Sequence, residues 1–299
     1  MSAPARAESV PVGLSPGRRA LRRLRRNRPA MLGAATLLGI VVLCFLVPPL
    51  LGLDPSSVEP SRQQQPPSLS HLFGTDSLGR DYLARVLVGG QTSLLVGWAA
   101  TLASVSVGVA VGASAGYFGG RLDEVLMRLV DFLYGIPYMF LVILVMLMFS
   151  ETARGEPLPV FVALGLVQWL TMARVVRGEV LALRRREFVL AARLLGASDV
   201  RVITRHILPN VAGVISVYAT LTVPSVIILE SFLSFLGLGV KLSWGQLVAD
   251  AVGVINPLRS LWWLLLWPAL FLGLTLLCLN HLGDGLRDAL DPKTRGREP

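Results

Sequence analysis

Residues that could do chemistry are scarce in this 299-residue chain, and their spacing argues against an enzyme. A nucleotide-hydrolysing P-loop has the pattern G-x-x-x-x-G-K-[ST], and neither Lys241 nor Lys293 follows a glycine. The histidines His71, His206 and His281 lie far apart in the sequence, and no H-E-x-x-H or Cys/His cluster accompanies them. We therefore expect no catalytic residue, no metal site and no cofactor in this chain.

Two acidic residues lie at the ends of apolar segments and are candidates for a transport pathway. Asp131 lies near the start of the segment Val125–Phe149, and Glu230 directly follows the segment Val211–Leu229. Ionisable residues in membrane-spanning segments are costly and often functional. Both lie near a predicted membrane surface, so a satisfied structural carboxylate is the competing interpretation. The chain offers no clear mid-membrane ionisable group, which a proton- or sodium-coupled carrier would need.

The polar stretch Glu187–Pro209 is the most distinctive candidate site, because it lies between two long apolar segments. Its sequence is EFVLAARLLGASDVRVITRHILP. Good helix formers run through Glu179–Leu195, Gly196 suits a left-handed helix end, and Ser198 can cap a second helix. The residue before a proline avoids the helical conformation, so we expect a break near Leu208.

Two short helices joined in this way predict a compact projection that docks into a groove of a soluble partner. The small residues Ala191 and Ala192 would leave the backbone approachable for such a partner. The candidate contact residues are Ala191, Ala192, Gly196, Ala197, Ser198, Leu208 and Pro209. The alternative is a solvated basic loop that contacts anionic lipid head groups. The residue types alone favour neither interpretation.

The composition is that of a membrane protein. The chain is 53% hydrophobic and 16% charged, with a mean hydropathy of +0.63, whereas soluble domains have roughly 25% charged residues. The net charge of +9 could indicate nucleic-acid binding, but the positive charge lies beside apolar segments, where membrane topology explains it. Cys44 and Cys278 both lie in apolar runs, so we expect buried, inert thiols.

Six segments approach the length of about 20 apolar residues that crosses a bilayer, which predicts an all-α protein with six transmembrane helices. They are Met31–Leu53, Ser93–Tyr117, Val125–Phe149, Leu158–Val176, Val211–Leu229 and Leu261–Leu279. Pro137 interrupts the third segment and Pro224 lies in the fifth, where each marks a pathway hinge or an ordinary packing kink. The second segment carries small residues near helical spacing, which predicts a face packed inside the bundle. These residues are Gly97, Ala100, Ser104, Gly108 and Gly112.

The distribution of arginine and lysine predicts that both ends of the chain are cytoplasmic, since this orientation places 22 of the 28 cationic side chains inside. The expected organisation begins with a basic tail at 1–30, a first span at 31–53 and an external segment at 54–90. A core of five spans at 91–282 and a cytoplasmic tail at 283–299 follow. Within the external segment, His71–Gly90 predicts a turn and a short amphipathic helix on the outer membrane surface.

The stretch LAARLLGASDVRVITRHILPN resembles the EAA loop of ABC importer permeases. That pattern is E-A-A, three residues, G, nine residues and I-x-L-P. The residues that match its register are Ala191, Ala192, Gly196, Leu208 and Pro209. Leu190 stands where the family has glutamate, and His206 stands where it has isoleucine.

Three further stretches are similar to the second permease subunit of dipeptide and oligopeptide importers. They are HLFGTDSLGRDYLARVLVGGQTSLLVG, SFLSFLGLG and NHLGDGLRDALDP, so the resemblance extends over nearly the whole chain. One departure is the link Val240–Ser243, which is shorter than the usual proline-containing link of the family.

The resemblance implies an ABC type I importer permease fold and a function as half of a peptide pathway. It implies a second homologous permease, two ABC ATPases that bind the EAA loops, and an external substrate-binding protein. ATP and magnesium would be bound by the ATPases, and the setting would be the lipid bilayer of a bacterial or archaeal plasma (inner) membrane. Import of a nickel chelate or glutathione stays open, as does a non-transporting scaffold, whereas the missing catalytic patterns disfavour a membrane enzyme.

Overall fold

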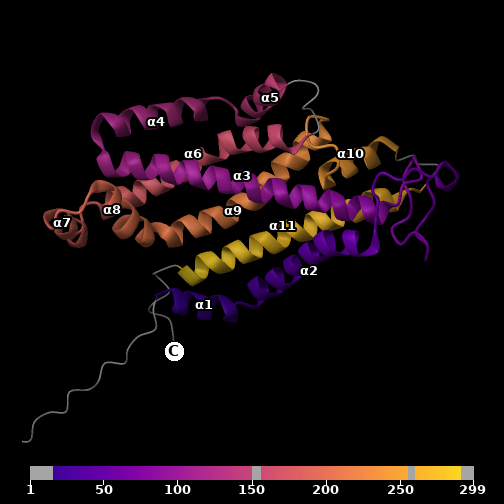
Figure 1. The fold of residues 1–299 in the computed structure, drawn as a ribbon, viewed down its shortest axis with the longest axis horizontal. Helices are drawn as coiled ribbons and strands as arrows, with labels where there is room; N and C mark the ends of the chain where they lie inside the picture. Colours follow the sequence, from indigo (N-terminus) through magenta and orange to yellow (C-terminus); the bar gives the residue numbers. More distant parts are fainter. Residues whose placement is uncertain (1–15, 150–155, 255–259, 291–299) are drawn as a thin grey trace, which may run out of the picture.

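The computed structural model describes residues 16–149, 156–254 and 260–290, and the fold is all-α, as predicted. Figure 1 shows long helices that run side by side, with α7 and α8 at one end and the connection between α2 and α3 at the other. Residues 1–15 and 291–299 of the two predicted tails lie outside the described residues. The described part of the first tail contains α1, Pro16–Arg26.

Among the described residues, five helices are long and apolar enough to cross a membrane. They are α2 (Arg28–Leu51), α3 (Tyr82–Phe118), α6 (Pro157–Leu183), the continuous helix Asp199–Phe235 that contains α9 (Leu208–Phe235), and α11 (Trp262–Leu290). A sixth span would consist of α4 (Gly120–Gly135) and α5 (Tyr138–Met148), which meet at a bend of 92°. The predicted six spans thus correspond to five long helices and one broken pair.

Pro137 accounts for the break between α4 and α5. The residue before it, Ile136, has the extended conformation that a following proline favours (φ −89°, ψ 128°). Proline also has no N–H for the helical hydrogen bond and its ring crowds the preceding turn. The predicted interruption is therefore confirmed. Pro224, in contrast, lies buried inside α9 without breaking it.

The short helix expected on the outer membrane surface is not a separate element. Helix α3 begins at Tyr82 and continues without interruption to Phe118. Its first turns are covered by protein, because the Tyr82 hydroxyl donates to the Leu264 carbonyl oxygen (2.6 Å) and Trp244 Nε1 donates to the Val86 carbonyl oxygen (2.9 Å). Leu264 belongs to α11, and Trp244 begins α10 (Trp244–Val254). The first turns of α3 therefore contact α10 and α11, and α3 continues from there into the membrane-spanning segment.

The predicted tail at 283–299 also begins inside a helix, since α11 extends to Leu290. At that end Gly285 approaches α2 closely, and a Cβ there would lie 2.4 Å from Ala30 Cβ. Asn27 accepts a hydrogen bond from the Ala30 N–H (3.2 Å) and caps α2. The end of α11 is therefore part of the packed structure.

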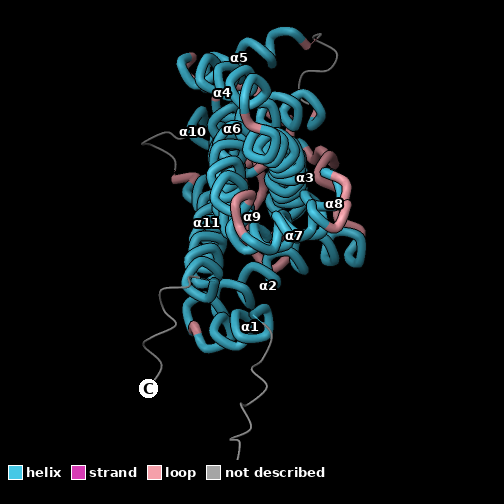
Figure 2. The backbone as a smooth tube through the Cα atoms, turned by 90° about the vertical axis from the view of Figure 1, so that its left-hand side faces the viewer, coloured by secondary structure: helices cyan, strands magenta, loops and turns pink. Residues whose placement is uncertain are grey.

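Helices α3, α6 and α9 form the middle of the molecule, with α4 and α5 on one side and α1 and α2 on the other (Figures 1 and 2). The small residues predicted to pack inside the bundle are buried, which confirms that prediction. A Cβ at Gly112 would lie 2.4 Å from the Ala173 carbonyl oxygen, and one at Gly97 would lie 2.7 Å from Ile227 Cγ1. The lack of side chains therefore lets α3 lie against the backbone of α6 and against α9. Cys44 and Cys278 are free thiols and both are buried, as expected.

Candidate functional site

The loop Glu187–Pro209 forms two short helices and a tight turn at one end of the molecule (Figure 1). Helix α7 spans Glu187–Leu194, and α8 spans Asp199–Val202. Between them Gly196 has φ = +80°, the left-handed conformation that the sequence predicted for it. Ser198 occupies the N-cap position of α8 with an extended backbone, but its hydroxyl makes no capping hydrogen bond. The helix pair is confirmed, and the side-chain cap is not.

Side chains hold this α7–α8 pair against the end of α3. The Tyr117 hydroxyl donates to Asp199 Oδ1 (2.6 Å), and Arg193 Nε donates to the Tyr117 hydroxyl oxygen (3.2 Å). The Arg193 guanidinium also lies over the Tyr117 ring, 4.6 Å from its centroid. Arg184 Nη1 donates to the carbonyl oxygen of Gly116 (3.0 Å). The pair is therefore attached to α3 by polar contacts on both of its helices and on the turn before them.

One side of the pair is buried in an apolar core shared with α3, α6 and α9. This side carries Val189, Ala192, Val202 and Ile207. Ala192 is 8% exposed, whereas Ala191 beside it is exposed. The prediction that both alanines leave the backbone approachable is therefore wrong for Ala192, because α7 turns that residue into the core.

The opposite side of the pair exposes large apolar side chains. Leu194 is 89% exposed, Leu195 is 88% exposed and Val200 is 70% exposed. The pair also borders an open groove of about 630 Å³, which is lined by Leu190, Ala197 and three arginines among other residues, but not by these three side chains. Exposed apolar clusters with a polar rim mark interaction sites.

The predicted break near Leu208 is absent. The chain forms a π-helical turn at Ile203–Ile207 and continues directly into α9, with Pro209 in its first turn. A proline is tolerated there, and the wider π turn before it leaves room for the ring. Asn210 Nδ2 donates to the His206 carbonyl oxygen (2.6 Å), so this acceptor in the π turn is used.

The two acidic candidates have partners of their own. Arg174 donates to Asp131 Oδ1 (2.6 Å), and the same guanidinium stacks on the Tyr134 ring, 3.9 Å from its centroid. Asp123 of α4 forms a second ion pair with Arg177 of α6. Both pairs connect α4 to α6, which is the arrangement expected for a satisfied structural carboxylate.

Glu230 is fully buried among hydroxyl groups. Ser234 donates to Glu230 Oε1 (2.7 Å), and Ser93 lies 3.4 Å from Oε2. The Ser234 hydroxyl accepts from Ser243 (3.1 Å), and the Ser93 hydroxyl accepts from the Trp244 N–H (3.1 Å). This polar cluster connects α3, α9 and the start of α10. The sequence identified Glu230 as a candidate, but it did not indicate the serines that surround it.

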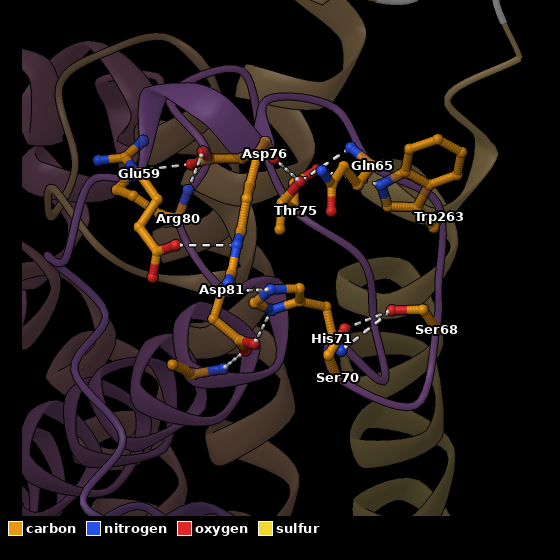
Figure 3. Close-up of polar contacts among 12 residues, drawn as sticks. Glu59, Gln65, Ser68, Ser70, His71, Thr75, Asp76, Arg80, Asp81 and Trp263 are labelled. Carbon is orange, nitrogen blue, oxygen red and sulfur yellow. Dashed lines mark hydrogen bonds and ion pairs between the residues drawn. The ribbon is translucent and has the colours of Figure 1, made fainter.

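The segment before α3 contains a second polar network, which the sequence did not reveal (Figure 3). Asp76 accepts hydrogen bonds from Arg80 Nε (2.7 Å), Arg85 Nη1 (2.6 Å) and the Leu78 N–H (2.9 Å). Burial by itself would raise the pKa of Asp76. The hydrogen bonds and the charge of Arg85 outweigh it and hold the pKa below its usual value. An aspartate that precedes the turn residues S-L-G-R was the available signal.

His71 joins the same segment to the start of α3 (Figure 3). Its Nδ1 lies 2.8 Å from Asp81 Oδ2, and its Nε2 lies 3.2 Å from Arg62 Nη1. Because arginine only donates, this geometry fits a neutral imidazole that accepts at Nε2 and donates from Nδ1. Asp81 also accepts from the Ala84 N–H (3.0 Å) and caps α3. The histidine therefore has a structural place, with no metal-binding group of His, Cys, Asp and Glu among the described residues.

Comparison with known proteins places this arrangement in a family. Residues 108–296 match the family described as binding-protein-dependent transport system inner membrane component. Residues 15–67 match the N-terminal TM domain of oligopeptide transport permease C. The chain belongs to this family of inner membrane transport components and has the ABC type I permease fold. It is a permease subunit and not an enzyme, since ATP hydrolysis in such systems belongs to other subunits.

Three relatives are similar in sequence to this chain over most of their length. The chain is 47% identical over 281 residues to the oligopeptide transport system permease protein OppC of Escherichia coli (strain K12), which covers 92% of this chain and 91% of that protein. It is 45% identical over 282 residues to the dipeptide transport system permease protein DppC of Bacillus subtilis (strain 168), covering 92% and 85%. It is 40% identical over 280 residues to the OppC protein of Mycobacterium tuberculosis (strain CDC 1551 / Oshkosh), covering 92% and 94%.

Proposed function

We propose that this chain is one of two homologous permeases of an ABC importer for short peptides, and that the α7–α8 pair binds the ATPases. The observation that carries the proposal is a firmly attached helix pair that exposes Leu194 and Leu195 almost completely. A rigid apolar surface suits a groove on a protein partner. A loop that only contacts lipid head groups needs charge but no such attachment.

The partners follow from the family and from this surface. Two ATPases would bind ATP and magnesium, a second permease would complete the pathway, and an external substrate-binding protein would deliver the cargo. Leu190 stands where related loops have glutamate, and it is 47% exposed beside the groove. We expect this contact with the ATPase to be apolar. The other proposed contacts are Ala191, Gly196, Ala197, Ser198, Leu208 and Pro209, of which Leu208 and Ala197 are partly buried.

Peptides are the favoured cargo. The relatives described above are named for oligopeptide or dipeptide transport, and they match this chain along most of its length. Short peptides therefore fit better than a nickel chelate or glutathione, and transport fits better than a scaffold role.

Reconstitution tests this function. The chain would be produced with the second permease, the two ATPases and the binding protein of the same transport system, and the complex would be placed in proteoliposomes. We expect the ATPases to co-purify with the chain and the vesicles to accumulate labelled trialanine only when ATP and binding protein are present. Accumulation of a nickel chelate or glutathione but not of trialanine would contradict the peptide assignment, and loss of the ATPases on purification would contradict the complex.

We propose that the chain lies in the plasma membrane of a bacterium or archaeon with both termini in the cytoplasm. Cysteine labelling tests this orientation. Ser61 and Ser198 are exposed, at opposite ends of the molecule, and both native cysteines are buried. We expect an impermeant maleimide to label Ser61→Cys in intact cells and Ser198→Cys only after permeabilisation. Ser243 would be a poor probe, since it is fully buried. Labelling of Ser198→Cys in intact cells would reverse the proposed topology.

A further inference from the structure

A cavity distinct from the α7–α8 groove lies where α4 and α5 meet, between α6 and α9. Its volume is about 490 Å³, within the range of small-molecule binding sites. Pro137 and Tyr138 line it at the break, Gln168 and Thr171 line it from α6, and Ser225 lines it from α9. With a rise of about 1.5 Å per residue, Gln168 and Ser225 lie about 15 Å from the helix ends opposite α7–α8. The cavity is therefore at mid-depth of the spans.

Two polar groups in this cavity have no hydrogen-bond partner in the part of the chain that the structure describes. Within the described residues, neither the Gln168 amide nor the Tyr138 hydroxyl makes a side-chain hydrogen bond. The other polar side chains are satisfied, because the Tyr134 and Thr171 hydroxyls bond to each other (2.6 Å) and Ser225 donates to the Leu221 carbonyl oxygen (3.2 Å). Gln168 is partly buried and Tyr138 is 51% exposed, so both groups are open to the cavity. An amide at this depth of a bilayer has no bulk water to bind, and leaving it unpaired is costly. The Gln168 amide is therefore available to bind a ligand in this cavity.

The side chains that line the cavity limit the chemical class of ligand that it can bind. None of the described residues that line the cavity is charged, and most are aliphatic. A glutamine amide carries two donors and an acceptor, which complement the C=O and N–H of a peptide group. In secondary transporters, substrate sites near the middle of the membrane are typically formed by broken helices. The 92° bend between α4 and α5 gives this cavity a similar setting.

We propose that this cavity is a subsite for the peptide main chain, in which the Gln168 amide pairs with one peptide group of the cargo. The inference rests on the proposed function and names a contact within it. Gln168 Oε1 accepts from the peptide N–H, and Nε2 donates to the carbonyl oxygen of the same chain. A neutral lining that binds the main chain does not select by side-chain charge, so one site serves peptides of different sequence. A lipid acyl chain would fill the apolar part and leave the amide unpaired.

The test compares two cargoes in proteoliposomes that hold the complete complex. The probes are trialanine and a depsipeptide analogue, in which one of the two peptide bonds is replaced by an ester and so lacks the N–H donor. Gln168→Met keeps the length of the side chain and removes the amide. We expect trialanine uptake to fall about tenfold in this variant. Uptake of the ester, which keeps the carbonyl contact but never had the N–H contact, should fall by a smaller factor, so the preference for amide over ester shrinks. The binding protein is identical in all assays, so its own selectivity cancels in that comparison.

The matched control is Gln246→Met, a glutamine of α10 whose Nε2 donates to Asp250 Oδ1 (2.8 Å), away from the cavity. It should leave both uptake and the amide preference unchanged. Equal losses of amide and ester uptake in Gln168→Met would show a structural role and overturn the subsite. Wild-type uptake and preference in that variant would indicate an acyl chain in the cavity and also overturn it. If wild-type complexes take up neither cargo, the proposed function fails, and the subsite fails with it.

Discussion

Replacing Gly108 with leucine will prevent α3 from packing against α6, and the yield of folded protein will fall at least tenfold. A Cβ at this position would lie 2.6 Å from Met172 Cβ and 2.8 Å from the Trp169 carbonyl oxygen. The carbonyl belongs to the backbone of α6, so the helices must separate before any side chain fits. Overpacking in a core costs about 1–3 kcal/mol when side chains can adjust, and more when a backbone must move.

The measurement is the amount of monodisperse protein recovered in detergent, compared with wild type in parallel preparations. Gly39→Leu is the control, because α2 leaves open space at that position and a Cβ there meets no atom within 4 Å. It should be recovered at the wild-type level. Recovery of Gly108→Leu at that same level would mean that the α3–α6 contact is not required for assembly.

A second large effect is expected at Gly196, where valine will abolish coupling and leave the spans folded. The residue has φ = +80°, a conformation that β-branched residues strongly disfavour. A Cβ there meets nothing within 4 Å, so the cost comes from the backbone and not from a clash. Strain of this type is worth about 1–3 kcal/mol and is relieved when the angle between α7 and α8 changes.

We expect peptide uptake by Gly196→Val to fall more than tenfold, with ATPases that either dissociate or hydrolyse ATP without transport. Gly196→Asn is the matched comparison, because asparagine tolerates the left-handed conformation and should keep most of the activity. Uptake, ATP hydrolysis and ATPase co-purification are measured together. Equal activity of the valine and asparagine variants would remove the coupling role from this turn. Ala192→Arg is a poorer test, because Ala192 lies in the core and a charge there would destabilise the loop itself.

The features that sequence predicted well depend on local composition or spacing. Apolar length located the spans, the missing N–H of proline located the break at Pro137, and small residues at helical spacing identified the packed side of α3. The glycine at position 196 indicated a left-handed conformation there, and the structure has it. Each of these signals resides in a short stretch of chain.

The features that sequence missed depend on contacts between distant residues. The hydroxyl of Ser93 reaches Glu230 from 137 positions away, and Tyr117 fixes Asp199 from 82 positions away. Ala192 is buried and Ala191 is not, because of the position of α3 beside α7. The local sequence pattern contains no information about that position. The same holds for the beginning of α3, which continues past the expected surface helix because α10 and α11 cover it.

Helix α3 joins the two ends of the molecule as one piece. It contains 37 residues, so at about 1.5 Å per residue it is a rod roughly 55 Å long. One end is fixed to the α7–α8 pair through Tyr117, and the other to α11 through the Tyr82 hydroxyl. A tilt of about 5° at the first end would displace the second by about 5 Å over such a length. Leverage along a single rigid helix would therefore carry a small rotation at the proposed ATPase contact to the opposite end of the molecule, without a relay of side chains in between.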